Sequence, residues 1–170
     1  MILRAMALAG GVAAGAGLSQ FPEFSQQYAQ RLGGAVDALS QVVADFDASA
    51  AAEGLTRQAA LQQMTGTDFV ERRRTDMETT FHRYDTLRDD LAVLKTSGPF
   101  MRAYHAARMT DGQIASRAWA AFQPAVPLSF AGVIFAGSGF VMGYALIGVL
   151  LSVAGMPFRR TKPKPPPNAA

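Results

Sequence analysis

The sequence contains no cysteine, only two histidines and a single tryptophan among its 170 residues. Without cysteine, disulfides, thiolate metal sites and cysteine nucleophiles are excluded. No P-loop, no G-x-S-x-G motif and no strand-associated G-x-G-x-x-G motif is present. The alternating Val/Ile/Thr runs that are typical of strands are also missing. Residues 118–158 contain no Asp, Glu, Lys or Arg. These absences indicate an α-helical protein with a long uncharged region near its C-terminus.

The uncharged region contains Leu128–Val153, a run of 26 residues that are apolar or small. A bilayer core about 30 Å thick requires about 20 helical residues, so this run predicts a transmembrane helix. The basic residues Arg159, Arg160, Lys162 and Lys164 follow it. The positive-inside rule places such a cluster in the cytoplasm, where it also meets lipid head groups.

A second apolar segment, Met1–Leu18, has Arg4 as its only charged side chain. It is either a signal peptide, cleaved after an A-x-A site at residues 14–16, or an uncleaved transmembrane anchor. We favour the anchor because apolar or small residues continue past that site to Leu18. Arg4 and the basic C-terminal cluster together predict that both termini are cytoplasmic and that the central part is periplasmic.

Each apolar segment contains a G-x-x-x-G motif, formed by Gly11 and Gly15 in the first and by Gly139 and Gly143 in the second. Small residues four apart allow helix backbones to approach closely in lipid. We expect these glycines to mark a helix–helix contact, within one chain or between chains.

All 13 acidic residues lie between Ser19 and Pro124, whereas the two ends carry only basic residues. The net charge of +3 therefore arises beside the apolar segments. Because positive charge in that position serves topology and lipid contact, we expect the lipid bilayer and a protein partner or a second copy, but no nucleic acid, as binding partners.

The charged middle has helical periodicity. One apolar stripe repeats every three or four residues, and it comprises Phe21, Phe24, Tyr28, Leu32, Val36, Leu39, Val43 and Phe46. Gly33 and Gly34 interrupt it and predict a kink or a close approach by another helix. Thr56 is expected to cap a short helix that ends near Met64, and Asp68 to cap a longer one that ends at residues 97–99.

A last amphipathic stretch, Phe100–Phe122, also has helical character, and its Trp119 and Phe122 lie where an aromatic belt at the membrane interface is expected. The fold class is therefore all-α, with two transmembrane helices flanking an antiparallel helical hairpin or small bundle. The expected divisions are an anchor (1–18), an extracytoplasmic domain (19–124), a transmembrane helix (125–158) and a basic Pro-rich tail (159–170).

Candidate sites for chemistry are sparse. His82 has Asp85 three residues later, but a catalytic or zinc site requires further ligands at defined spacing. We therefore expect no catalytic residue, no metal and no cofactor. Arg72, Arg73 and Arg74 form the densest charge cluster. They are either a solvated helix face with ion pairs from Glu71 to Arg74 and from Arg72 to Asp76, or a docking patch for an acidic partner or a phospholipid head group.

The segment after the anchor reads Leu18-Ser-Gln-Phe-Pro-Glu-Phe-Ser-Gln-Gln-Tyr-Ala-Gln-Arg-Leu-Gly-Gly34, and Val36-Asp37, Val43-x-Asp45-Phe46-Asp47 and Gly54-Leu55-Thr56 follow. This pattern resembles a proteobacterial family of membrane proteins, domain-of-unknown-function family 2937, over nearly the whole chain. The resemblance implies the inner membrane of a Gram-negative bacterium and brings no activity, cofactor or catalytic residue. Within this segment, Phe21, Phe24, Gln27 and Tyr28 form either a partner surface or one face of an ordinary amphipathic helix.

Three functions are compatible with these features. The first, which we favour, is a non-enzymatic accessory or scaffold subunit, or a homo-oligomer, acting through the periplasmic helices. The second is a component of an envelope channel or transport assembly, although Ser129, Ser138, Tyr144 and Ser152 are the only polar residues in the second span. The third is a membrane-tethered enzyme that uses His82.

Overall fold

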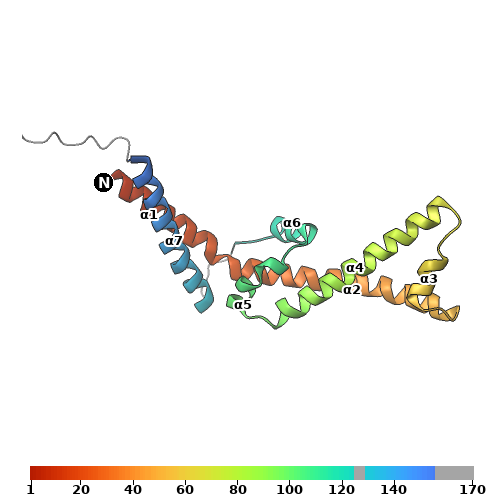
Figure 1. Cartoon of the computed structure of the whole chain (residues 1–170). Helices are drawn as coiled ribbons and strands as arrows, with labels where there is room; N and C mark the ends of the chain where they lie inside the picture. The colour runs from red at the N-terminus through yellow and green to blue at the C-terminus, as the bar shows by residue number, and fades with distance from the viewer. Residues whose placement is uncertain (125–128, 156–170) are drawn as a thin grey trace, which may run out of the picture. The chain divides into compact units, whose positions relative to one another are not determined.

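The structure is a computed structural model that describes residues 1–124 and 129–155. Within these ranges the chain forms helices and no strand, as predicted (Figure 1). The chain divides into two compact units. The first unit contains Met1–Phe21 and the described residues after Val126, and the second contains Pro22–Ala125. Two stretches are long and apolar enough to cross a membrane, one within Ile2–Ala52 near the N-terminus and the other at Phe130–Ala154.

The first unit is a pair of helices, α1 (Ile2–Ser19) and α7 (Phe130–Gly155). Gly10 of α1 lies beside Ile147 of α7, and Gly15 lies beside Ala136. Because residue numbers rise along one helix as they fall along the other, the two helices are antiparallel (Figure 1). At 1.5 Å per residue, α1 is about 27 Å long and α7 about 39 Å, so both are close to or above the ~30 Å thickness of a bilayer core.

The second unit is built on two long helices, α2 (Phe21–Ala52) and α4 (Asp68–Thr96). The predicted apolar stripe of α2 supplies its core, where it meets the apolar residues of α4. One cluster joins Tyr28, Leu32, Val36, Leu87, Leu94, Ile114 and Ala118, and a second joins Val43, Leu61 and Phe81. Early residues of α2 therefore pack near late residues of α4, which gives the antiparallel hairpin that the sequence predicts.

Shorter helices complete the second unit (Figure 1). The helix α3 (Arg57–Gln63) lies between the two long helices in sequence and buries Leu61. As predicted, Thr56 caps α3, with its hydroxyl accepting the Ala59 N–H at 3.2 Å. The cap of α4 is Thr67 and not Asp68, because the Thr67 hydroxyl accepts the Val70 N–H at 3.3 Å. Asp68 is instead the first helical residue, where its charge favours the helix dipole.

The amphipathic stretch Phe100–Phe122 is helical, but it is not one continuous helix. The structure has α5 (Pro99–Tyr104), a 3₁₀ turn η1 (Ala106–Arg108) and α6 (Gly112–Ala120) in its place. The α-helix is interrupted after Tyr104, and α6 begins after Asp111, whose carboxylate accepts the N–H groups of Gln113 at 3.0 Å and Ile114 at 2.9 Å. An aspartate that caps a helix in this way adopts a non-helical backbone, and Asp111 is extended. It therefore starts a new helix where the apolar periodicity alone suggests continuity.

Of the two alternatives at Gly33 and Gly34, a close approach by another helix is wrong for the described chain, and the kink stays a prediction. The helix α2 continues through both residues to Ala52. A Cβ built on either glycine meets nothing within 4 Å. No helix of the described chain therefore approaches α2 closely at this point.

Candidate functional site

The four glycines of the two G-x-x-x-G motifs lie together where α1 and α7 meet. A Cβ built on Gly139 would be 2.7 Å from the Ala14 carbonyl oxygen and 3.0 Å from the Gly15 Cα. A Cβ on Gly143 would be 2.5 Å from the Ala14 Cβ. A carbon atom needs about 3.5–4.0 Å from its neighbours, so neither position has room for a side chain. The glycines therefore make the contact within one chain, which is one of the two alternatives that the sequence leaves open.

The same spacing continues along α1 beyond the motif. The buried residues of this helix are Ala7, Gly11, Gly15 and Ser19, each four positions after the last. A built Cβ on Gly11 is 3.0 Å from the Phe140 carbonyl oxygen, and one on Gly15 is 2.8 Å from the Ala136 carbonyl oxygen. The contact is thus a backbone-to-backbone approach along several turns, which is the packing that small residues permit in lipid.

The outer surface of this pair is apolar. The exposed large side chains of α1 are Ile2, Leu3, Met6, Leu8, Val12 and Leu18. Those of α7 are Phe130, Val133, Ile134, Val141, Met142, Tyr144, Leu146, Val149, Leu150 and Val153. Apolar surface on this scale in a two-helix unit is typical of a membrane or protein contact. Arg4 lies exposed in the first turn of α1, and Arg159, Arg160, Lys162 and Lys164 lie outside the described residues.

Two hydroxyl groups on α7 are bound to the helix itself. The Ser138 hydroxyl donates to the Phe135 carbonyl at 3.0 Å, and the Ser152 hydroxyl donates to the Gly148 carbonyl at 2.7 Å. Such bonds satisfy a serine in lipid without a partner from another helix. These serines therefore fit an apolar environment without requiring a water-filled path.

Most of the candidate partner residues at the start of α2 make contacts within the protein itself. Phe21 packs against Phe135 of α7, with ring centroids 5.5 Å apart. Tyr28 is fully buried in the core of the second unit. Its hydroxyl lies near the Asp111 backbone without a hydrogen bond of ordinary geometry. Burial raises the pKa of this hydroxyl, and the carboxylates of Asp111 and Asp90 add to the effect. The expectation of a partner surface is therefore wrong for Tyr28, which is a core residue.

Phe24 belongs to an aromatic cluster with two residues from the far end of the same unit. Its ring meets Trp119 at 6.1 Å and Phe122 at 6.0 Å, both edge to face, while Trp119 and Phe122 stack on each other. Trp119 nevertheless remains 68% exposed. The remaining candidate, Gln27, donates to the Glu23 carboxylate at 3.0 Å. The cluster thus presents an exposed indole close in sequence to the start of α7.

The arginine cluster near the start of α4 is a largely solvated helix face. Arg72 and Arg73 are exposed and Arg74 is half-buried. The ion pair found there joins Arg73 to Asp76 at 3.0 Å, and the described structure contains neither of the two pairs that the spacing suggests. Since both partners of that pair are more than half exposed, it contributes at most about 1 kcal/mol to stability.

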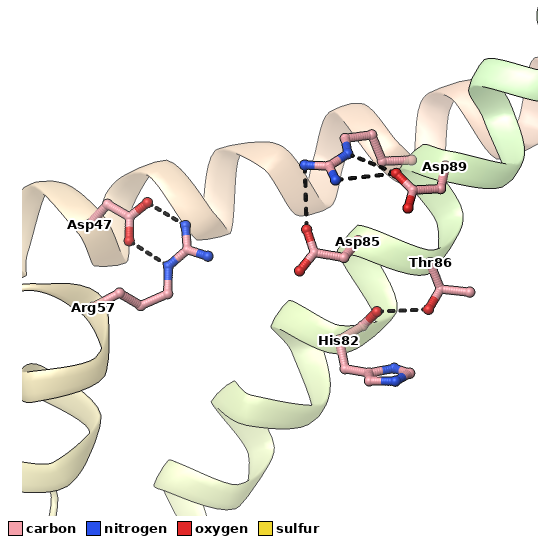
Figure 2. Close-up of polar contacts among 7 residues, drawn as sticks. Asp47, Arg57, His82, Asp85, Thr86 and Asp89 are labelled. Carbon is pink, nitrogen blue, oxygen red and sulfur yellow. Dashed lines mark hydrogen bonds and ion pairs between the residues drawn. The ribbon is translucent and has the colours of Figure 1, made fainter.

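His82 forms no pair with Asp85. Figure 2 shows the His82 ring directed away from Asp85, and Asp85 instead accepts Arg88 at 3.4 Å. The His82 backbone carbonyl accepts the Thr86 hydroxyl at 3.0 Å. Among the described residues, no three His, Asp or Glu side chains are grouped so that they could hold a metal ion. The structure therefore lacks the His82–Asp85 pair that the sequence spacing allows.

Several ion pairs join residues on different helices, so residue spacing within one helix does not predict them. In Figure 2, Arg57 of α3 forms a two-pronged pair with Asp47 of α2, and its Nε donates at 2.7 Å. Arg57 also stacks over the Phe81 ring at 4.6 Å. The hydrogen bond from Arg57 lowers the pKa of Asp47. These contacts fasten α3 to both long helices.

Two further pairs hold the C-terminal part of the second unit to α4. Arg83 donates to the Asp111 carboxylate at 2.9 Å. Asp90 is buried, with an 8% exposed side chain, and accepts Arg108 at 3.1 Å. Partners separated by 18 and 28 residues give no periodic signal in the sequence, although an aspartate amid the apolar stripe of α4 is the kind of residue that requires a partner.

The comparisons with known proteins agree with the resemblance seen in the sequence. No curated protein and no solved structure matches the chain. The family described as "Protein of unknown function (DUF2937)" matches residues 2–160. Since this match covers nearly the whole sequence, the chain belongs to the DUF2937 family.

Proposed function

We propose that this protein is a non-enzymatic inner-membrane protein whose polar helical domain acts as a scaffold or accessory subunit, or assembles with further copies. The observation that carries the proposal is the α1–α7 pair, which joins backbones along glycines and exposes apolar side chains outward. Such a pair anchors both ends of the central helices in one bilayer.

The glycine contact also supports retention of α1. Gly139 and Gly143 of α7 leave space that Ala14 and Gly15 fill. If residues 1–18 were removed as a signal peptide, α7 would keep a glycine face without a partner in the chain. The anchor interpretation therefore agrees better with this geometry than cleavage does.

The proposed topology places both termini in the cytoplasm and the central domain in the periplasm. Antiparallel helices put the start of α1 and the end of α7 on the same side, together with Arg4. Because the chain lacks cysteine, a single cysteine at exposed Gln58 is a clean reporter. We expect a membrane-impermeant thiol reagent to label it in cells with a permeabilised outer membrane. An Ile2→Cys variant should react only after lysis, and the reverse pattern would contradict the topology.

The scaffold role is tested by purification from membranes in a mild detergent, followed by native mass spectrometry. A foreign protein at fixed stoichiometry supports an accessory subunit, and a uniform oligomer supports self-assembly. A monomer that retains no partner would overturn both. The mass also reports whether residues 1–18 remain attached. We do not favour a channel, because the Ser138 and Ser152 hydroxyls bond to their own helix.

A further inference from the structure

Gly33 and Gly34 in the middle of α2 have no role within the described chain. Both lie inside α2 with ordinary helical backbones, and among the described residues the glycines with positive φ are Gly54 and Gly66. A Cβ on either would meet nothing within 4 Å. A glycine in a helix interior costs about 0.5–1 kcal/mol relative to alanine. The protein thus carries two unfavourable residues that neither its conformation nor its own packing requires.

The two glycines lie in a groove of about 530 Å³ between α2, α4 and α5. Gln26, Gln30 and Asp37 line it from α2, Leu91 and Lys95 from α4, and Arg102 from α5. At the glycines, the helix backbone is bare toward this space. A segment from outside the chain can therefore approach the backbone there as closely as α1 approaches α7.

The charge of the groove is predominantly positive. The Arg102 Nε donates to the Leu94 carbonyl at 3.0 Å, which fixes the guanidinium near the last turn of α4 and leaves its other N–H groups without an ion pair. In the described structure, Lys95 and Asp37 also form no ion pair. Two cations therefore face one carboxylate, with the amides of Gln26 and Gln30 beside them.

We propose that this groove docks an acidic segment of a partner protein, a deepening of the accessory-subunit role that rests on the proposed function. The bare backbone at Gly33 and Gly34 suits a helix or an extended chain that approaches closely, which a small anion does not need. Lys95 and Arg102 complement carboxylates on that segment and fix its register.

The test places a photo-crosslinking amino acid at Gln30 of the full-length protein in living cells, with the same amino acid at exposed Gln62 as the control position. The cross-linked peptide is then identified by mass spectrometry. We expect one protein, joined through a segment rich in Asp and Glu, from Gln30 but not from Gln62. Cross-links from Gln30 to a second copy, to lipid or to nothing would overturn the proposal.

Substitutions in the groove then test whether its shape and its charge are needed for docking. Gly34→Leu fills the groove and Lys95→Glu reverses its charge, and each should lower the cross-link yield at least fivefold. Arg31→Glu is the matched control, because this exposed arginine is on α2 outside the groove. A lysine introduced into the partner's acidic segment should restore the yield with Lys95→Glu. An unchanged yield with Lys95→Glu would refute the docking site even if Gly34→Leu failed to fold.

The accessory-subunit role and the docking groove can be refuted separately. If native purification recovers a stoichiometric partner but Gln30 gives no cross-link to it, the accessory function stands and the groove assignment falls. If purification gives only a monomer, the proposed function falls, and a Gln30 cross-link to an acidic segment would then indicate a transient partner.

Discussion

The sharpest prediction concerns glycines of α7 that differ in what faces them. Gly139→Ala and Gly143→Ala should each weaken the α1–α7 contact, whereas Gly137→Ala and Gly148→Ala should not. The added Cβ at Gly143 would lie 2.5 Å from the Ala14 Cβ, while at Gly137 and Gly148 it would meet nothing within 4 Å. All four changes add one methyl group to the same helix, so the controls match the test closely.

The size of the expected destabilisation follows from how far the 2.5 Å distance at residue 143 falls below an ordinary carbon–carbon contact. Ordinary carbon contacts are about 3.5–4.0 Å, so the helices must separate by roughly 1 Å to admit the methyl group at residue 143. Overpacking of this kind costs about 1–3 kcal/mol. Since each 1.4 kcal/mol is a factor of ten, the equilibrium between the paired and separated helices should shift about 5- to 150-fold.

A disulfide assay can measure this shift. A Cβ on Gly10 is 3.3 Å from the Ile147 Cβ, near the 3.5–4.5 Å typical of disulfides. Gly10→Cys with Ile147→Cys introduces the only two cysteines of the chain. Oxidation is then followed as sodium dodecyl sulfate is titrated into a mild detergent. Gly143→Ala should lower the mole fraction of sodium dodecyl sulfate at which half of the disulfide cross-linking is lost. If it behaves as Gly137→Ala does, the reasoning is refuted.

Three further predictions concern the second unit and are measured by urea unfolding of the full chain in mild detergent. Gly33→Ala and Gly34→Ala should each raise the free energy of unfolding by about 0.5–1 kcal/mol, because the methyl group meets no neighbour and favours the helix; a loss would reveal packing at these sites. Asp111→Ala should cost about 1–2 kcal/mol through loss of the α6 cap, and it also removes the ion pair with Arg83; Asp111→Asn removes the same charge but retains a cap acceptor, so the difference between the two variants measures the cap. Because the pKa of Asp47 is lowered in the folded state, its contribution is present above the ordinary aspartate pKa near 4 and disappears as the pH falls through the folded value. Its pair with Arg57 is more than a third exposed, so Asp47→Asn should remove at most about 1 kcal/mol at pH 7 and flatten the acid limb of the stability curve.

Much of the fold could be predicted because it depends on periodicity and composition. Residues from Phe21 to Phe46 repeat at helical spacing, and the structure buries that stripe. Thr56 indicates the start of α3, because a threonine at the N-cap accepts a hydrogen bond from the backbone N–H three residues later. The break between α5 and α6 was harder to predict, because the apolar spacing continues across residues 105–111, where the structure has the turn η1 and the Asp111 cap.

The sites were less predictable, because a sequence pattern does not say what faces a residue. Gly33-Gly34 and Gly139 with Gly143 are equally plausible contact motifs on spacing alone, yet only the second pair meets another helix of the chain. Tyr28 shares a polar segment with Gln27, but its position on the inner face of α2 buries it. The Asp90–Arg108 pair depends on how η1 packs against α4, which no local rule specifies.

The contact between α1 and α7 also implies a delay during biosynthesis, because the two helices are far apart in the sequence. About 110 residues separate the end of α1 from the start of α7, and ribosomes add about 5–20 residues per second. The first helix must therefore wait roughly 5 to 25 seconds for the only segment of the described chain that fits its glycine face. During that interval Gly11 and Gly15 have no partner within the chain, so the α1–α7 contact can form only after α7 has been synthesised.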